Sequence, residues 1–424
     1  MMYSFAEKLW PINRSITGAG VRHSLSAIKE IIPNLNIFEV LTGTIAFDWP
    51  VPKEWEVKEA YILTPSGNKI CSFRENNLHL VGYSIPVNKV LSLTELQNHL
   101  YSIPEQPTAI PYITSYYKER WGFCISHDER EKLVCGDYTV VIESRLFSGS
   151  LTYGEIVIPG KSKKEVFLST YICHPSMANN ELSGPVVTTF LAKWLNERKE
   201  NKYTYRIIFI PETIGSIVYI SKNLKKMKEN IFAGFNVSCV GDDRSYSYLP
   251  SRSGNTISDA VAKHVLKHLS SSFISYEWKD RGSDERQYCA PHVDLPIASI
   301  MRTKYGEYSE YHTSLDTLGA VVTDQGLSGG FNALRSALEV LENNIYPTVQ
   351  VKCEPQLGTR GLYPNLSTKD VKEEVGLMMD LITWSDGSKS LLEIAEICHV
   401  PMWELYPLLE LMVSNDLISV ADFN

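Results

Sequence analysis

The stretch YRIIFIPETIGS at residues 205–216 sets the expected fold class. Its first six residues are almost entirely apolar, which is typical of a strand buried on both faces of a sheet. The Pro-Glu-Thr turn that follows leads into the helical pattern of residues 215–228. A buried strand followed directly by a helix is the repeating unit of α/β proteins, so the sequence predicts an α/β fold.

This alternation continues on both sides of the stretch. Further strands are predicted at 154–159, 165–171, 233–240 and 295–301, and further helices at 184–197, 256–270 and 325–343. The pattern predicts a central mixed, mostly parallel sheet with helices on both faces. In such sheets, ligands bind beyond the carboxyl ends of the strands.

The rest of the chain divides into segments of different character. Residues 1–41 have helical spacing and join 151–345 in the main domain, while 42–150, rich in Trp, Tyr, Pro and Val, predict an inserted mostly β domain. A linker is expected at 346–366, where prolines interrupt the periodicity. Residues 367–424 carry three short amphipathic helices, which predict a winged-helix or helix-turn-helix module.

The composition excludes several classes of function. The chain has 424 residues, 44% of them apolar, and a net charge of −8, which gives no reason to expect nucleic acid or an anionic membrane as a partner. The C-terminal module contains far more Asp and Glu than Lys and Arg, so an interaction or assembly role is favoured over DNA binding. No apolar run approaches the roughly 18 residues of a membrane span, and no signal peptide is evident, so a cytoplasmic location is expected. The eight cysteines form no CxxC pair, which argues against a zinc ribbon.

Three polar segments follow predicted strands, and a fourth lies further along the chain. They are CHPSMANNELSG at 173–184, PETIGS at 211–216, SCVGDDR at 238–244 and YHTSLDT at 311–317. Histidine and carboxylate side chains in such places suit metal ligation or proton transfer. Each segment alone is also open to a structural interpretation, as a turn, a helix cap or a histidine held by turn hydrogen bonds. Their order along the chain favours one metal site to which all four contribute.

Taken together, these segments resemble the co-catalytic zinc aminopeptidases, peptidase clan MH, which include leucyl aminopeptidases and glutamate carboxypeptidases. The stretches LWPINRSITGAGVR at 9–22, SYYKERWGFC at 115–124 and GSDERQYCAP at 282–291 resemble more closely an aminopeptidase-like bacterial subfamily. That resemblance implies a zinc exopeptidase fold with an inserted β domain of unknown role and a C-terminal winged helix. It also implies an association with surface-polysaccharide loci.

The resemblance implies a role for individual residues. His174 corresponds to the first zinc ligand, His312 to the last, and Glu212 to the general base. Asp284 falls in a Ser-Asp turn that supports the site. The implied neighbours of the His312 ligand are Tyr311, Thr313 and Asp316.

Three positions depart from the family pattern. Asn180 replaces a bridging Asp, Thr213 replaces a Glu ligand, and Ser238 replaces an Asp ligand, with Asp242 four residues later. A neutral amide bridges two dications poorly, so one zinc ion is favoured over two. The candidate metal ligands are His174, Asn180, Asp242 and His312, with Glu181 or Glu212 as further donors.

The sequence therefore predicts a zinc-dependent, aminopeptidase-like hydrolase of a peptide or a small amide, with Glu212 as the base that activates water. Arg14 and Arg252 are candidates for binding a substrate carboxylate, and structural ion pairs are the alternative. A peptidase fold without activity that binds a peptide or a surface-polysaccharide precursor is the second hypothesis. A transcriptional regulator is the third. The additional domains leave a homo-oligomer open.

Overall fold

The structure is a computed structural model that describes residues 1–362 and 369–422. The end of the predicted linker, the start of the predicted C-terminal module and the last two residues of the chain lie outside the described residues, at 363–368 and 423–424. The chain forms two compact units, each of which combines two segments. The first is Met1–Asp259 with Phe273–Asn332, and the second is Ala260–Ser272 with Ala333–Asn424.

An eight-stranded mixed sheet forms the centre of the first unit. In spatial order its strands are β1 (Asn36–Leu41), β10 (Ser150–Ile158), β12 (Thr204–Ile210), β11 (Glu165–Tyr171), β13 (Ile231–Asn236), β16 (Ile297–Met301), β14 (Ser247–Leu249) and β15 (Ile274–Ser275). The four central strands β12, β11, β13 and β16 run parallel to one another. The strands β1 and β10 pair with their neighbours in the antiparallel sense, and β14 is antiparallel to β16 but parallel to β15.

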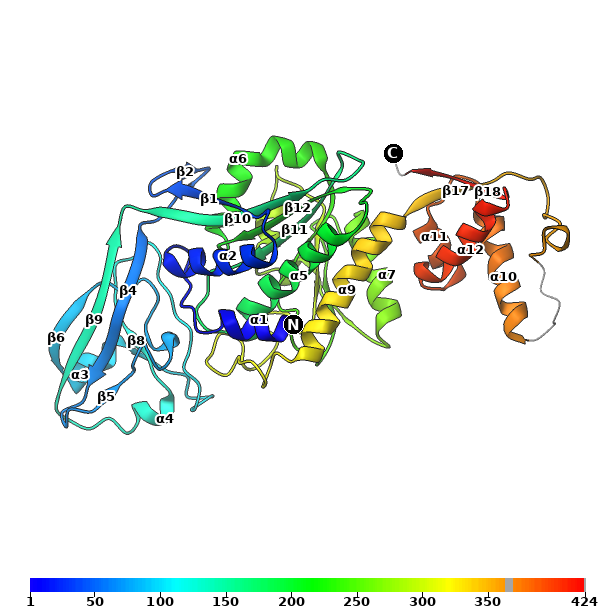
Figure 1. Ribbon diagram of the computed structural model, residues 1–424. Helices are drawn as coiled ribbons and strands as arrows, with labels where there is room; N and C mark the ends of the chain where they lie inside the picture. Colours follow the sequence, from blue (N-terminus) through cyan, green and yellow to red (C-terminus); the bar gives the residue numbers. More distant parts are fainter. Residues whose placement is uncertain (363–368, 423–424) are drawn as a thin grey trace. The chain divides into compact units, whose positions relative to one another are not determined.

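Helices cover both faces of this sheet (Figure 1). On one face, α5 (Ser183–Glu197) approaches β11 so closely that a Cβ on Gly184 would lie 2.4 Å from Oγ1 of Thr170. On the other face, the ring of Phe167 contacts the rings of Tyr219 and Tyr288. Residues an odd number apart on a strand point to opposite faces, so the two helix layers sandwich β11. The remaining helices that lie wholly in this unit include α1 (Met2–Leu9), α2 (Ala19–Ile31), α6 (Ile214–Asn230) and α8 (Glu285–Tyr288).

The predicted helical character of the N-terminal segment was wrong at its end. Helix α2 ends at Ile31, and Pro33 disfavours helical geometry in the residue before it. Residues Asn36–Leu41 instead form the edge strand β1, paired with β10 from Asn36↔Glu155 to Leu41↔Ser150. The β-branched and aromatic residues of this segment suit a strand.

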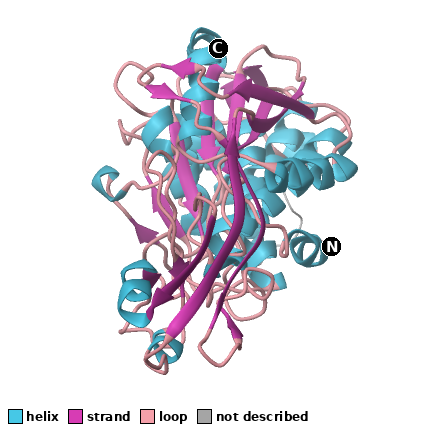
Figure 2. Cartoon of the chain, turned by 90° about the vertical axis from the view of Figure 1, so that its left-hand side faces the viewer, coloured by secondary structure: helices cyan, strands magenta, loops and turns pink. Residues whose placement is uncertain are grey.

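The segment predicted as an inserted β domain contains a four-stranded antiparallel sheet of its own. Figure 2 faces these long strands. In β9, Tyr138, Val140 and Ile142 are buried at every second position, which is the period of a strand with one face in a core. In spatial order the strands are β5 (Lys69–Ile70), β4 (Glu54–Leu63), β9 (Asp137–Phe147) and β6 (Val87–Ser92).

The second unit contains three consecutive helices and a strand pair. The strands β17 (Ile345–Val349) and β18 (Ile418–Asp422) pair in the antiparallel sense. Ser390 and Glu393 form a capping box at the start of the second helix. The helices are α10 (Lys369–Trp384), α11 (Leu391–Cys398) and α12 (Met402–Ser414), and the unit also takes in parts of α7 (Ile257–Leu269) and α9 (Asp324–Asn343). Among the described residues, no helix is long and apolar enough to cross a membrane.

Candidate active site

The predicted site residues lie where neighbouring parallel strands end. His174 follows β11, Glu212 follows β12, and Asp242 follows β13. Parallel strands present their carboxyl ends at one edge of the sheet, so the loops that carry these residues converge there. The site therefore stands where ligands bind in sheets of this class.

His174 is oriented by a buried ion pair. Nδ1 of His174 lies 3.1 Å from Oε2 of Glu181, and the same carboxylate accepts the backbone N–H groups of Cys173 and His174 at 3.3 and 3.0 Å. The other oxygen of Glu181 accepts a hydrogen bond of 2.8 Å from Nε of Arg14, and both side chains are 0% exposed. Glu181 and Arg14, both site candidates from the sequence, thus fix the histidine ring without reaching its Nε2.

The Nε2 side of His174 is the open one. It forms no hydrogen bond within the described part of the chain, and Oε2 of Glu212 lies 3.8 Å away. Burial lowers the pKa of His174, but Cys173 and Glu181 raise it by more, so it lies well above the ordinary value. An ion that bound at Nε2 would displace a proton, as metal ions commonly do at histidine.

Glu212 is held by its neighbours in a position facing His174. Oε1 accepts a hydrogen bond of 2.6 Å from the hydroxyl of Ser283, and the backbone N–H of Glu212 donates to Sγ of Cys173 at 3.2 Å. Burial raises the pKa of Glu212, although the charge of His174 opposes the shift. A carboxylate with a raised pKa that faces an open imidazole nitrogen can exchange a proton with a reacting molecule.

Thr213, next to Glu212, has a strained backbone. Its φ is 64° and its ψ is −79°, and Ile214 N–H donates across it to the carbonyl of Glu212 at 2.8 Å. A β-branched residue at positive φ is rare and is found where surrounding contacts impose it. Asp284 supplies such a contact by accepting the Thr213 N–H at 2.7 Å. Burial and the neighbouring Glu212 raise the pKa of Asp284 to about 8, which makes it a neutral acid at pH 7.

His312 lies beside His174. The two ring centroids are 5.8 Å apart, and the ring of Tyr311 stacks on that of His312 at 3.9 Å. Burial and then the charge of His174 lower the pKa of His312 to about 3, so its imidazole is neutral. Neutral imidazole is the form that binds metal ions.

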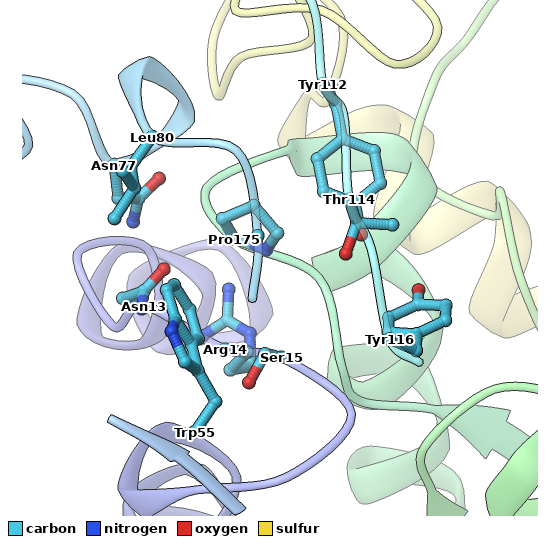
Figure 3. Close-up of a pocket in the computed structure, with 11 residues that line it drawn as sticks. Asn13, Arg14, Ser15, Trp55, Asn77, Leu80, Tyr112, Thr114, Tyr116 and Pro175 are labelled. Atoms are coloured by element: carbon cyan, nitrogen blue, oxygen red, sulfur yellow. The ribbon is translucent and has the colours of Figure 1, made fainter. Parts of the chain in front are cut away.

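The inserted domain contributes directly to this site. The ring of Tyr112 makes edge contacts with both histidines, at 5.3 Å from His174 and 5.1 Å from His312. Its segment pairs with the His312 loop, since Tyr112 N–H donates to the carbonyl of His312 and Ser314 N–H donates to that of Ile110. Figure 3 shows Tyr112 and Tyr116 from the inserted domain on one side of a small cavity that Arg14 and Pro175 also line. No motif around Tyr112 distinguishes it in the sequence.

Two candidate ligands are already engaged elsewhere. Asp242 accepts four hydrogen bonds, from Thr303 N–H and hydroxyl, from the Asn179 amide and from Arg244 N–H, which occupy both of its oxygens. Asp242 therefore connects the loops that carry Thr303 and Asn179. Oδ1 of Asn180 accepts from the hydroxyl of Tyr171 at 2.9 Å, and its Nδ2 is buried with no partner among the described residues.

The remaining candidates support the loops or lie apart from them. Asp316 accepts the backbone N–H groups of Asn179 and Asn180, which fixes the turn ahead of α5, and burial raises its pKa to about 6. Oγ of Ser238 is buried without a hydrogen bond in the described structure. Arg252 forms an ion pair with Asp294 in which both side chains are more than 40% exposed, and within the described residues no contact connects it with His174 or His312.

Residues 3–344 match a family described as a domain of unknown function (DUF4910). The chain belongs to the DUF4910 family. Residues 344–420 match a winged helix-turn-helix. A Clostridium acetobutylicum protein named for polysaccharide biosynthesis and an aminopeptidase-like domain is 44% identical over 93% of this chain and 90% of its own length.

Solved structures extend this relationship. A crystal structure from C. acetobutylicum, provisionally described as a peptidase, has 41% identity and a TM-score of 0.93 over 99% of this DUF4910 chain and 96% of its own. A zinc aminopeptidase from Bacillus subtilis has 13% identity and a TM-score of 0.57 over 80% of this chain and 93% of its own. The predicted fold class and its likeness to the zinc aminopeptidases are thereby confirmed, as is the C-terminal winged helix.

The donor atoms of this DUF4910 site fit one zinc ion. Nε2 of His174 is open, His312 is neutral, and Oε2 of Glu212 lies 3.8 Å from Nε2 of His174. Imidazole nitrogens are common ligands of catalytic zinc, and a carboxylate beside the ion can accept a proton from its water. The separation of the two rings is compatible with both imidazoles binding the same ion.

The same atoms do not fit a second ion. A second dication needs an anionic bridge, and the oxygen of Asn180 is neutral and already bonded to Tyr171. The hydroxyl of Thr213 accepts a hydrogen bond of 2.9 Å from Nη2 of Arg286, so a cation already stands at that position. The neighbourhood is thus suited to a single dication and a guanidinium.

A second group of metal-ligating side chains lies in the C-terminal unit and has a structural explanation. Nδ1 of His264 is 2.5 Å from Oε1 of Glu396, while its Nε2 accepts the backbone N–H of Met402 at 2.9 Å. Nε2 must keep its lone pair for that bond, so the proton resides on Nδ1 and is donated to Glu396. Although His268 is close enough to complete a ligand set, His264 has no free donor atom for a metal ion. It instead links α7 to α11 and α12.

This link predicts a pH-dependent stability of the C-terminal unit. Burial lowers the pKa of His264 below its unfolded value of about 6.5. The stabilisation by neutral His264 is therefore present above about pH 6.5 and is lost as the pH falls below it. We expect protection of the Met402 amide against hydrogen exchange to decrease between pH 7.5 and 5.5, and to decrease less in His264→Gln. The exposed His399→Gln is the control, and equal pH dependence in wild type and His264→Gln would contradict the assignment.

Proposed function

We propose that this protein is a zinc-dependent hydrolase that cleaves an amide or peptide bond. One observation carries the proposal. Glu181 holds the Nδ1 side of His174, so that the open Nε2 faces the carboxylate of Glu212 across 3.8 Å with His312 alongside. Two neighbouring imidazoles with one facing carboxylate suit metal-assisted hydrolysis.

The residues divide the chemistry between them. When bound, zinc supplies Lewis acidity that makes water a nucleophile near neutral pH. Glu212 accepts the proton of that water at Oε2 and delivers it to the leaving amine, and Ser283 keeps the other oxygen in place. Arg14 and Glu181 orient His174 and are too deeply buried to contact a substrate. This oriented carboxylate–histidine pair is a common outer support of metal sites.

The inserted domain limits which molecules can enter. Tyr112 lies against both histidines, and its backbone pairs with the His312 loop, so a bound molecule shares the space with this aromatic wall. A short peptide with a free amino terminus or a small amidated metabolite fits such a covered site better than an internal segment of a folded protein. The proposal therefore favours an exopeptidase-like or amidohydrolase activity.

Metal analysis and turnover test the proposal separately. After zinc-replete purification and removal of loosely bound ions, we expect about one zinc ion per chain and hydrolysis of aminoacyl reporter amides. The variant His312→Ala is expected to lose most of its zinc and its activity, while His292→Ala, at an exposed position, keeps both. Zinc that remains bound in His312→Ala would remove that residue from the ligand set, and wild-type protein without zinc would exclude the hydrolase.

A second candidate function is binding without turnover. It is favoured by the neutral residues Asn180, Thr213 and Ser238, of which the first two are already engaged by Tyr171 and Arg286. Such a protein would hold a peptide or a surface-polysaccharide precursor, in keeping with the name of the C. acetobutylicum relative. Zinc in the purified chain together with turnover would exclude this candidate.

A further inference from the structure

Arg286 projects from the short helix α8 toward the same neighbours as Glu212. Its Nε donates to the carbonyl of Ser283 at 3.0 Å, and its Nη2 donates to Oγ1 of Thr213 at 2.9 Å. Ser283 is also the residue that holds the Glu212 carboxylate, and Thr213 follows Glu212 in the chain. The guanidinium and the proposed base are therefore positioned by the same two residues.

Arg286 forms no salt bridge in the described part of the chain, although the Glu212 carboxylate is near enough to interact with its charge. No carboxylate lies within ion-pair distance of it among the described residues, whereas the guanidinium groups of Arg14, Arg206 and Arg244 each pair with a glutamate. The side chain is partly exposed, and its Nη1 forms no hydrogen bond in the part of the chain that the structure describes. Nη1 of the rigid, planar guanidinium is thus available to donate a hydrogen bond to an oxygen of a bound molecule.

The surroundings permit an anion to approach. Where the zinc aminopeptidase resemblance places acidic ligands, this chain has the neutral side chains Asn180, Thr213 and Ser238. Burial and then Glu212 raise the pKa of the buried Asp284, which favours its neutral form.

We propose that Arg286 binds an anionic group, a carboxylate or a phosphate, of the molecule that this site takes. The proposal deepens the proposed function, since it rests on the location of that site, but anion binding itself requires neither zinc nor turnover. A carboxylate or phosphate matches the planar fork of a guanidinium and would form charge-assisted hydrogen bonds with it. The substrate class narrows to amides that carry a negative charge close to the bond that is cleaved.

The test uses metal-free protein, so that zinc cannot bind the anion. Inorganic phosphate and acetate are titrated separately by calorimetry into wild type, Arg286→Met and Arg286→Lys. We expect the wild type to bind at least one of the two anions, Arg286→Met to bind it at least tenfold more weakly, and Arg286→Lys to lie between them. The anion that binds with the higher affinity shows whether the site prefers a phosphate or a carboxylate group. Arg281→Met, which removes an exposed arginine nearby, is expected to bind as the wild type does.

A further variant distinguishes anion binding by Arg286 from a purely structural role of that residue. Thr213→Val removes the side-chain partner of Arg286 but leaves the guanidinium in place. Anion binding is expected to persist in Thr213→Val. Equal loss in Thr213→Val and Arg286→Met would show that Arg286 serves only to hold Thr213, and the proposal would be overturned. It would also be overturned if the wild type bound neither anion, or if Arg286→Met bound as the wild type does. Absence of zinc from the wild type would exclude the hydrolase and leave this result standing.

Discussion

Replacing Arg14 with methionine is expected to destabilise the protein by about 3–5 kcal/mol, because it leaves the buried carboxylate of Glu181 without its partner. Both side chains are 0% exposed, and Nε of Arg14 lies 2.8 Å from Oε1 of Glu181. The same guanidinium also donates to the carbonyl groups of Leu9 and His174, so three segments lose a common donor. Urea unfolding of the metal-free protein measures the difference.

An exposed ion pair provides the matched control for this substitution. Arg145 pairs with Glu56 on neighbouring strands, where the two side chains are 65% and 37% exposed. Arg145→Met is expected to change the free energy of unfolding by less than about 1 kcal/mol. The double variant Arg14→Met with Glu181→Gln removes both buried charges and keeps an oxygen that can accept the backbone N–H groups of Cys173 and His174. It is therefore expected to regain part of the lost stability. If Arg14→Met changed the free energy of unfolding as little as Arg145→Met does, other groups would have to stabilise the buried charge of Glu181.

The Arg14 pair also shows what the sequence could not provide. Arg14 stands in a glycine-rich turn that looks exposed, and its partner is 167 residues away. Whether an arginine binds a substrate or a buried glutamate is decided by tertiary packing, which leaves no local pattern. For Tyr112 the difficulty is similar, since it reaches the histidines from an inserted domain through backbone pairing with the His312 loop.

Features with a local physical cause were predicted well. The strand expected at 205–210 is β12 (Thr204–Ile210), because a short apolar run that ends in a turn suits a strand buried on both faces of a sheet. The positions of His174 and Glu212 followed from a topological rule, namely that loops at the carboxyl ends of parallel strands converge. The edge strand β1 was missed because its conformation depends on pairing with β10, over a hundred residues further along the chain.

Replacing Glu212 with glutamine is expected to lower kcat on aminoacyl reporter amides by about 10²–10⁴-fold, while zinc remains bound. Glutamine keeps the size of the side chain and can still accept the hydrogen bond from Ser283, but it cannot take a proton from water. Because the substitution also removes a negative charge 3.8 Å from Nε2 of His174, zinc affinity is expected to weaken somewhat, so assays are made at saturating zinc. Steady-state kinetics and elemental analysis of the same preparation separate these two effects.

Asp243→Asn is the matched control for the loss of this carboxylate. Asp243 is an exposed acid in a loop that follows a neighbouring strand of the same sheet, and it accepts a hydrogen bond from Thr323. We expect its kcat to remain within about twofold of the wild type, because the side chain contacts no residue of the histidine cluster. If Glu212→Gln and Asp243→Asn retained equal activity, Glu212 would not be the base. If Glu212→Gln lost its zinc even at saturation, the carboxylate would act chiefly as a ligand, and a different group would have to accept the proton.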